Sequence, residues 1–173
     1  MREPRPFFVT GTDTEVGKTF VSSALLRMAR ERGLKCVGIK PIAAGCELED
    51  GQFRNEDALE LMAAAKSKVP YEIVNPIALE PPIAPHIALK LVGRDVRAAE
   101  LAHHCSVGVE ADFVLIEGAG GWLVPLNSNE TIADACVEIG ADVILVVGMK
   151  LGCLNHALLT SAAIKHAGLN LAG

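Results

Sequence analysis

Apolar residues along this chain follow two alternating patterns, short β-branched runs and longer stretches with the spacing of amphipathic helices. The short runs at residues 7–10, 35–39, 112–116 and 142–147 predict β-strands. Helical spacing predicts helices near residues 19–32, 55–65, 96–104, 132–139 and 155–166. The predicted strands are apolar on both faces, which is typical of a parallel sheet covered by helices on both sides. The pattern therefore predicts an α/β fold with a doubly wound, mostly parallel sheet.

Two segments depart from this alternation. Residues 66–85 contain five prolines with no sustained period, so we interpret them as an ordered surface connection or as the lining of a pocket. Residues 168–173 follow a helix and begin what reads as another buried strand, so we expect the sheet to continue in a segment that this sequence lacks. Because no repeat or linker pattern is present, residues 1–173 are interpreted as one domain.

Composition and charge exclude several classes of protein. Apolar residues make up 50% of the chain, but their uninterrupted runs are far too short to cross a bilayer. Residues 1–6 mix charges with prolines and lack the apolar core of a secretory signal, so we expect a cytoplasmic location. With 16 basic and 21 acidic residues, the net charge of -5 offers no general attraction to nucleic acid or to an anionic membrane.

The cysteines and histidines do not form a recognisable metal or disulfide pattern. The five cysteines are odd in number and widely spaced, with no C-x-x-C pair, so we expect reduced and mostly buried thiols. His103 and His104 are adjacent, and adjacent residues point in different directions on a helix, so we interpret them as surface residues.

The strongest chemical signal is the sequence Gly-Thr-Asp-Thr-Glu-Val-Gly-Lys-Thr at residues 11–19, directly after an apolar strand and before an amphipathic helix. A phosphate-binding loop needs this context, because glycines let backbone amides face the phosphates and the helix N-terminus favours negative charge. Lys18 is placed to reach the β and γ phosphates, and Thr19 to bind Mg²⁺. The loop therefore predicts binding of a magnesium-bound nucleoside triphosphate.

The loop departs from the usual spacing at one point. Five residues separate Gly11 from Gly17, where the usual motif has four, and Thr12 stands at the usual glycine place. The alternative interpretation is a glycine-containing turn that binds nothing. A chance Gly-Lys-Thr between a strand and a helix is uncommon, so the intact core at residues 17–19 favours the phosphate-binding loop.

Three charged residues are expected near this loop. Glu117 closes a buried strand and is followed by a glycine-rich turn, at the sheet edge where α/β proteins bind ligands and where a carboxylate can hold Mg²⁺. Lys40 closes another strand at the same edge, where it can neutralise charge on a transferred phosphoryl group or remain solvated. Asp57 falls in the first turn of a predicted helix, and its position alone favours a simple helix-dipole role.

These segments together resemble the dethiobiotin synthetases, which are P-loop NTPases by fold. The resemblance runs from residue 8 to residue 173. It rests on residues 11–19 and on the ordered motifs Gly-Ile-Lys-Pro at 38–41, Arg-Asn-Glu-Asp at 54–57, Val-Asn-Pro at 74–76, Ala-Pro-His at 84–86, Glu-Gly-Ala-Gly-Gly-Trp at 117–122, and Val-Val-Gly-Met-Lys-Leu-Gly-Cys-Leu-Asn-His at 146–156. Several motifs in this order are far more specific than any one of them.

The resemblance implies a reaction and a set of roles. In that family CO₂ joins 7,8-diaminononanoate as a carbamate, whose oxygen attacks the γ-phosphorus of ATP, and the neighbouring amine then closes the ureido ring and releases phosphate. It implies that Lys18 and Lys40 are the catalytic cations and that Thr19, Asp57 and Glu117 hold Mg²⁺. This implication replaces the simple helix-dipole interpretation of Asp57.

The resemblance also implies where the ligands bind. ATP would contact Glu15, Val16, Gly17, Lys18, Thr19, Phe20, Asp57, Glu117, Gly118, Ala119 and Gly120. The diamine would contact Thr14, Lys40 and Ala44, and its carboxylate would meet Gly152, Cys153, Leu154 and Asn155 of a second subunit across a two-fold interface. A homodimer acting on small molecules is thus implied.

Two departures from the family pattern are visible. Ala44 stands where the family usually carries a serine that contacts the substrate, so one hydroxyl is absent. The family also continues beyond the equivalent of residue 173 into an Asn-Asp motif and a segment that contacts the adenine.

Two alternative functions share the loop. Switch ATPases that partition plasmids or place the division septum carry a signature lysine five residues before the loop lysine, and here that residue is Asp13. Amidotransferases of cobalamin synthesis begin with a similar Gly-Thr-Asp-Thr, but they need additional glutaminase domains, for which this chain has no room.

Overall fold

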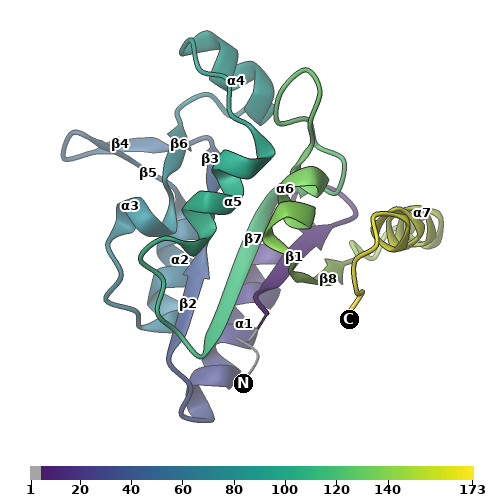
Figure 1. The fold of residues 1–173 in the computed structure, drawn as a ribbon, viewed down its shortest axis with the longest axis horizontal. Helices are drawn as coiled ribbons and strands as arrows, with labels where there is room; N and C mark the ends of the chain where they lie inside the picture. The colour runs from purple at the N-terminus through teal and green to yellow at the C-terminus, as the bar shows by residue number, and fades with distance from the viewer. Residues whose placement is uncertain (1–4) are drawn as a thin grey trace.

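A computed structural model describes residues 5–173 and contains a four-stranded parallel sheet in the order β2-β7-β1-β8 (Figure 1). Its strands are β1 (Phe7–Gly11), β2 (Cys36–Ile39), β7 (Phe113–Gly121) and β8 (Asp142–Val146). The prediction of a doubly wound, mostly parallel sheet is confirmed. Residues 1–4, which belong to the charged start of the chain, lie outside the described residues.

Alternation along the strands explains why helices cover both faces of the sheet. Phe8 and Ile116 are buried in one apolar cluster, whereas their strand neighbours Val9 and Leu115 are buried in another. Successive side chains of a strand point to opposite faces, so two clusters are expected if both faces are covered. The covering helices are α1 (Lys18–Glu31), α2 (Glu56–Ala65), α5 (Ala98–Ser106) and α6 (Ile132–Ile139). A fifth helix, α7 (Cys153–His166), lies beside the sheet.

These five helices and the four strands lie close to where the apolar pattern predicts them, with one correction. Strand β7 continues to Gly121, so Glu117 lies inside the strand and residues 118–121 are not the predicted glycine-rich turn. Helices α1 and α2 supply Leu26 and Leu61 to the cluster that holds Val9, and α5 and α6 supply Leu101 and Ile132 to the other. Figure 1 shows α7 beside β8, away from the rest of the molecule.

Residues 66–85 are not a surface connection, which corrects one prediction. They contain α3 (Tyr71–Val74) and β6 (Ile77–Leu79), and β6 pairs in parallel with β3 (Ile42–Ala44). A hairpin of β4 (Glu47–Glu49) and β5 (Gln52–Arg54) and the helix α4 (Pro85–Leu91) complete the described elements. Elements of three or four residues show too few positions for a periodic pattern, so the sequence could not predict them.

The end of the described chain pairs with the sheet, but it is not buried. Val143 donates its backbone N–H to the carbonyl of Asn170 and accepts from Ala172, both at 2.8 Å, and the described bridge is parallel. The prediction that residues 168–173 begin a strand is confirmed by this pairing. The prediction that the strand is buried is wrong, because these residues are half-buried or exposed.

Two compositional predictions also meet the structure. All five cysteines are free, four of them buried and Cys153 half-buried, as expected for thiols that form no disulfide. Within residues 5–173, none of the helices combines the length and the apolar character needed to cross a membrane.

Candidate active site

The loop between β1 and α1 has the backbone shape of an anion-binding loop. Gly17, with φ 94°, and Glu15, with φ 58°, both adopt left-handed conformations. A side chain at Gly11 would bring its Cβ to 2.7 Å from Cγ2 of Val16, so the curl requires glycine there. The loop leads directly into the N-terminus of α1, whose free amides and dipole favour phosphate.

Lys18 lies inside this curl and not on the surface. Its side chain is buried, and Nζ donates to the backbone oxygen of Asp13 at 3.1 Å. Burial lowers the pKa of Lys18, and the nearby Lys40 ammonium lowers it further. An ammonium that is both buried and near another cation gains much from a bound anion, so the loop is prepared for phosphate.

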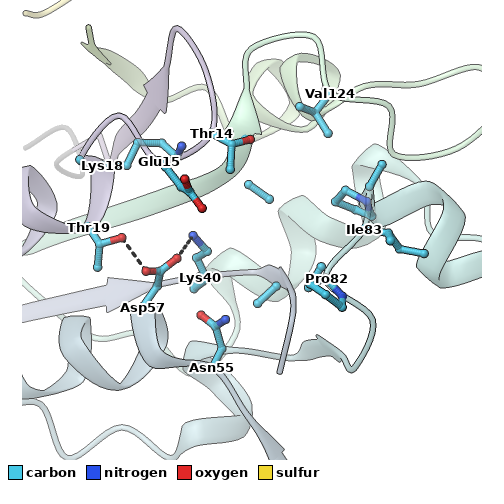
Figure 2. A pocket seen from close by; sticks show the side chains of 17 residues that line it. Thr14, Glu15, Lys18, Thr19, Lys40, Asn55, Asp57, Pro82, Ile83 and Val124 are labelled. Atoms are coloured by element: carbon cyan, nitrogen blue, oxygen red, sulfur yellow. Dashed lines mark hydrogen bonds and ion pairs between the residues drawn. The ribbon is translucent and has the colours of Figure 1, made fainter. Parts of the chain in front are cut away.

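Four side chains from different parts of the fold meet directly beside the loop, and Figure 2 shows three of them, Thr19, Lys40 and Asp57. Lys40, just after β2, places Nζ 2.7 Å from Oδ2 of Asp57 and 2.7 Å from Oε1 of Glu117. Thr19 of α1 places Oγ1 2.8 Å from Oδ1 of Asp57 and 3.0 Å from Oε1 of Glu117. One hydroxyl proton can serve only one carboxylate at a time, so Thr19 is shared between the two. We call these four residues the Lys40 cluster.

Opposite charges within the cluster shift the pKa values of Lys40 and Asp57. Burial acts to lower the pKa of Lys40, but the Glu117 and Asp57 carboxylates outweigh it and the pKa is raised. For Asp57, burial acts to raise the pKa, and the adjacent Lys40 ammonium together with the Thr19 hydrogen bond lowers it overall. Lys40 is therefore a cation and Asp57 an anion across the ordinary pH range.

The oxygen atoms of the cluster fit a magnesium ion. Glu117 is fully buried, and among the described residues its Oε2 has no hydrogen-bond partner. Two carboxylates and a hydroxyl are the hard oxygen donors that Mg²⁺ prefers, with water and phosphate oxygens completing the shell. Within residues 5–173, no group of three or more His, Cys, Asp or Glu side chains is placed to hold a metal ion.

A cavity of about 620 Å³ opens above the loop and the cluster. One side is polar and carries Lys18, Thr19, Lys40 and Asp57, and the opposite wall is apolar (Figure 2). The lining residues are Thr14, Glu15, Gly17, Lys18, Thr19, Lys40, Ala43, Ala44, Asn55, Asp57, Pro82, Ile83, Ala84, Pro85, Ala119, Gly120 and Val124. Its size suits a small-molecule ligand.

Most of the predicted site residues lie in or directly beneath this cavity. Glu117 and Gly118 are beneath the lining: Glu117 holds Lys40, and the backbone oxygen of Gly118 is 3.5 Å from Lys40 Nζ. Val16 points away, because a Cβ at Gly148 would lie 2.7 Å from its Cγ1. Phe20 is on the outer face of α1 and is 76% exposed.

The residues predicted to bind the substrate carboxylate are not brought to this cavity. Gly152, Cys153, Leu154 and Asn155 form the start of α7, and none of them lines it. Lys150, just before them, pairs with Asp13 on the outer side of the loop at 2.8 Å. This hydrogen bond and the Thr14 amide lower the pKa of Asp13.

Several residues at the site were missed by sequence reasoning. The apolar wall from Pro82 to Pro85 is not one of them, because the lining of a pocket was one of the two interpretations of residues 66–85, and it is confirmed for these four residues. Asn55 lines the cavity, and Asn75 hydrogen-bonds the backbone of Lys40. The available signal for Asn75 was the Val-Asn-Pro motif at residues 74–76, to which no role had been given.

Sequence relatives match this chain over nearly its whole length. A family model described as an AAA domain matches residues 5–173. The ATP-dependent dethiobiotin synthetase BioD of Cellvibrio japonicus is 53% identical over 170 residues, covering 98% of this chain and 75% of that protein. The protein of the same name from Marinobacter nauticus is 52% identical over 170 residues, covering 96% of this chain and 72% of that protein.

Solved structures show a likeness of fold. The septum site-determining protein MinD of Pyrococcus horikoshii, complexed with Mg-ADP, has a TM-score of 0.58 at 18% identity. That match covers 98% of this chain and 68% of the other, so this chain spans about two thirds of that structure and about three quarters of the curated relatives.

Proposed function

This chain belongs to the ATP-dependent dethiobiotin synthetase family, and on that premise we propose that the cavity above the Lys40 cluster closes the ureido ring of dethiobiotin. The activity is the ATP-dependent synthesis of dethiobiotin in biotin biosynthesis. The substrates proposed for the cavity are 7,8-diaminononanoate, CO₂ and ATP.

The position of Lys40 is the observation that carries the proposal. Its ammonium lies between two carboxylates, in a cavity that it shares with the phosphate-binding loop. A fixed, buried cation at this place faces the region where negative charge develops as a phosphoryl group is transferred. The geometry supports phosphoryl transfer to a bound acceptor and not merely nucleotide binding.

The proposed reaction has three steps. One amine of the substrate adds to CO₂, releasing a proton and forming a carbamate. A carbamate oxygen attacks the γ-phosphorus of ATP, the bond to the β-phosphate oxygen breaks, and ADP leaves. The second amine then attacks the carbonyl carbon of the carbamic-phosphoric anhydride, phosphate leaves, and a proton is lost as the ring closes.

Each residue of the cluster has a role in this scheme. Lys18 holds the β and γ phosphates from inside the loop, and Lys40 stabilises charge on the carbamate and the transferred phosphoryl group. Thr19, Asp57 and Glu117 are the residues proposed to hold Mg²⁺, which when bound neutralises phosphate charge. The apolar wall, including Ala44 and Ile83, excludes water that would hydrolyse the anhydride.

We propose a homodimer formed by α7. Leu154, Leu158 and Leu159 are 78%, 72% and 62% exposed, and Ile164 is the only buried residue described in this helix. A helix that exposes several leucines within two turns resembles an interface and not a solvated surface. In the dimer, residues 152–155 would receive the carboxylate of a substrate bound to the other subunit.

The structure gives no support to the switch-ATPase alternative. The place of the signature lysine is held by Asp13, which is engaged by Lys150 at 2.8 Å. Asp13 therefore supplies no cation to the phosphates, which is what the signature lysine would supply.

The direct test uses ¹³C-bicarbonate. The purified chain is incubated with 7,8-diaminononanoate, ¹³C-bicarbonate and MgATP, and the product is analysed by mass spectrometry. We expect dethiobiotin with one ¹³C, formed only with ATP, lost in Lys18→Ala and retained in Lys90→Ala, an exposed lysine on α4. ATP hydrolysis that proceeds without diamine and yields no labelled product would contradict the proposal and favour a switch-type ATPase.

A further inference from the structure

The backbone of Lys40 is held outside the main sheet. Pairing between β2 and β7 ends at Ile39, which faces Ile116. Lys40 is only 5% exposed, and its backbone N–H donates to the carbonyl of Val74 at 2.8 Å. The next residue is Pro41, which has no N–H, so the sheet ladder cannot continue here.

The carbonyl of Lys40 is held by the side chain of Asn75. Nδ2 of Asn75 donates to this oxygen at 2.6 Å, and Asn75 is only 3% exposed. Residues 74–75 therefore bind both backbone polar groups of Lys40. The carbonyl of Val74 accepts its N–H, and the side-chain amide of Asn75 donates to its carbonyl. A buried carbonyl without such a partner would destabilise the fold.

Tyr71 continues this chain of hydrogen bonds. Its hydroxyl donates to Oδ1 of Asn75 at 2.9 Å and accepts the backbone N–H of Asn55 at 2.7 Å. The guanidinium of Arg54 lies over the Tyr71 ring, 4.1 Å from its centroid. The hydroxyl thus uses its donor and an acceptor position in two buried bonds, and the stacked guanidinium restricts the ring.

Asn55 connects these hydrogen bonds to Asp57 of the Lys40 cluster. It is the N-cap of α2, and its Oδ1 accepts the N–H of Ala58 at 3.2 Å. Asp57 lies in the same first turn, and its Oδ2 is 2.7 Å from Lys40 Nζ. The hydrogen bonds therefore run from the Lys40 carbonyl through Asn75 and Tyr71 to the N-terminus of α2. The ion pair between Asp57 and Lys40 connects α2 back to Lys40, so these contacts form a closed network.

We propose that Asn75 and Tyr71 are positioning residues that fix the separation between the Lys40 backbone and the N-terminus of α2. Neither residue lines the cavity, so they act through Lys40 and Asp57. This inference rests on the proposed function for the role of Lys40 in phosphoryl transfer. Small displacements of a catalytic group have large effects on rate, because a misplacement of about 1 Å can slow a reaction by about 100-fold.

Tyr71→Phe is the mildest test, because it removes one oxygen and keeps the ring under Arg54. We expect kcat for dethiobiotin to fall by about tenfold, within the range for a slightly misplaced catalytic group. KM for MgATP should change less than twofold, since the phosphate-binding loop makes no hydrogen bond to Tyr71 or Asn75.

Asn75→Leu removes the hydrogen bonds of the side-chain amide to Tyr71, Lys40 and Ile77, and Asn127→Leu is its matched control. Asn127 likewise donates from Nδ2 to a backbone carbonyl, that of Val96 at 2.9 Å, outside the cavity. We expect both variants to lower the melting temperature, but only Asn75→Leu to lower kcat. The double variant Tyr71→Phe/Asn75→Leu should lose no more rate than the larger single change, as expected for one connected chain.

A second readout does not depend on turnover. Hydrogen exchange of the Asn55 amide, which donates to the Tyr71 hydroxyl, should accelerate in Tyr71→Phe and stay unchanged in Asn127→Leu. If the wild type makes no dethiobiotin, the proposed function fails, but the rates of amide hydrogen exchange still test the hydrogen-bond network. The positioning role is overturned if Tyr71→Phe, folded at the assay temperature, keeps its kcat, or if Asn127→Leu loses as much rate as Asn75→Leu.

Discussion

The sheet edge at Lys40 and the helix α7 differ in the burial and the contacts of their side chains. At the sheet edge, Lys40, Thr19 and Glu117 are buried or half-buried, and each contacts at least two polar groups from other elements. In α7, Ile164 alone is described as buried, while Leu154 and Leu158 face outward. The side chains of the first region contact one another within one chain, whereas the leucines of the second are left exposed.

This difference separates two kinds of predicted site residue. Residues that follow strands converge without help from another molecule, because the carboxyl ends of parallel strands share an edge. Residues 152–155 stay outside the cavity, so their predicted role requires a second copy of the chain. Changes at the sheet edge should therefore act within a protomer, and changes at α7 through assembly.

The largest effect is expected from Lys40→Met. The variant removes the cation that faces the transferred phosphoryl group, so kcat should fall by about 1000-fold. It also leaves the fully buried Glu117 without its ammonium partner, which should lower the free energy of unfolding by about 3 kcal/mol. Turnover assays and urea unfolding measure the two effects.

Lys150→Met is the control for that variant, because Lys150 also forms a carboxylate pair but at an exposed position. Exposed pairs contribute little, so urea unfolding should be nearly unchanged. Equal destabilisation by both variants would contradict the description of the Lys40 cluster as a buried ionic network.

The next largest effect tests α7. Leu158→Asp places a charge on the proposed interface and should weaken dimerisation by about 100-fold, corresponding to about 2.7 kcal/mol. Analytical ultracentrifugation measures the assembly, and turnover should recover as protein concentration rises. Leu91→Asp on α4 is the control, since Leu91 is 69% exposed and Leu158 72%. A monomeric wild type with full activity would exclude the dimer proposal.

A smaller effect follows from the lowered pKa of Asp57. A carboxylate with a lowered pKa stabilises the fold above its ordinary value of 3.8, and that contribution is lost as pH falls through the folded-state pKa. The difference in unfolding free energy between wild type and Asp57→Asn should therefore be constant above about pH 5 and should shrink below pH 3.8. Urea titrations from pH 6 to pH 3 measure it, and a constant difference across that range would contradict the Lys40–Asp57 pairing.

The smallest effect is expected at Ala44. This residue lines the cavity, and the family pattern usually has a serine there. Ala44→Ser should lower KM for the diamine by about fivefold, the value of one hydrogen bond of about 1 kcal/mol. KM for ATP serves as the internal reference. If both values change together, the hydroxyl acts on the whole cavity and not on the diamine.

Sequence reasoning reached the sheet, the loop and the charged edge, because each depends on local pattern. Glu117 and Lys40 could be placed at one edge once their strands were recognised. Asp57 was placed there only by the family resemblance, since a helix-start carboxylate has a sufficient local explanation. The pairing of β3 with β6 was missed because three residues carry no period. The role of Asn75 depends on contacts 35 residues apart, which no local pattern encodes.

The cysteines provide a chemical reporter for the assembly. Burial raises the pKa of Cys105 and of Cys136 to about 12, so neither presents an appreciable thiolate to an alkylating reagent at neutral pH. Cys153 is the least buried of the five thiols and begins the helix proposed to meet a second copy. The rate at which a maleimide dye alkylates this one thiol should fall with increasing protein concentration. The rate therefore measures subunit association without any substitution in the chain.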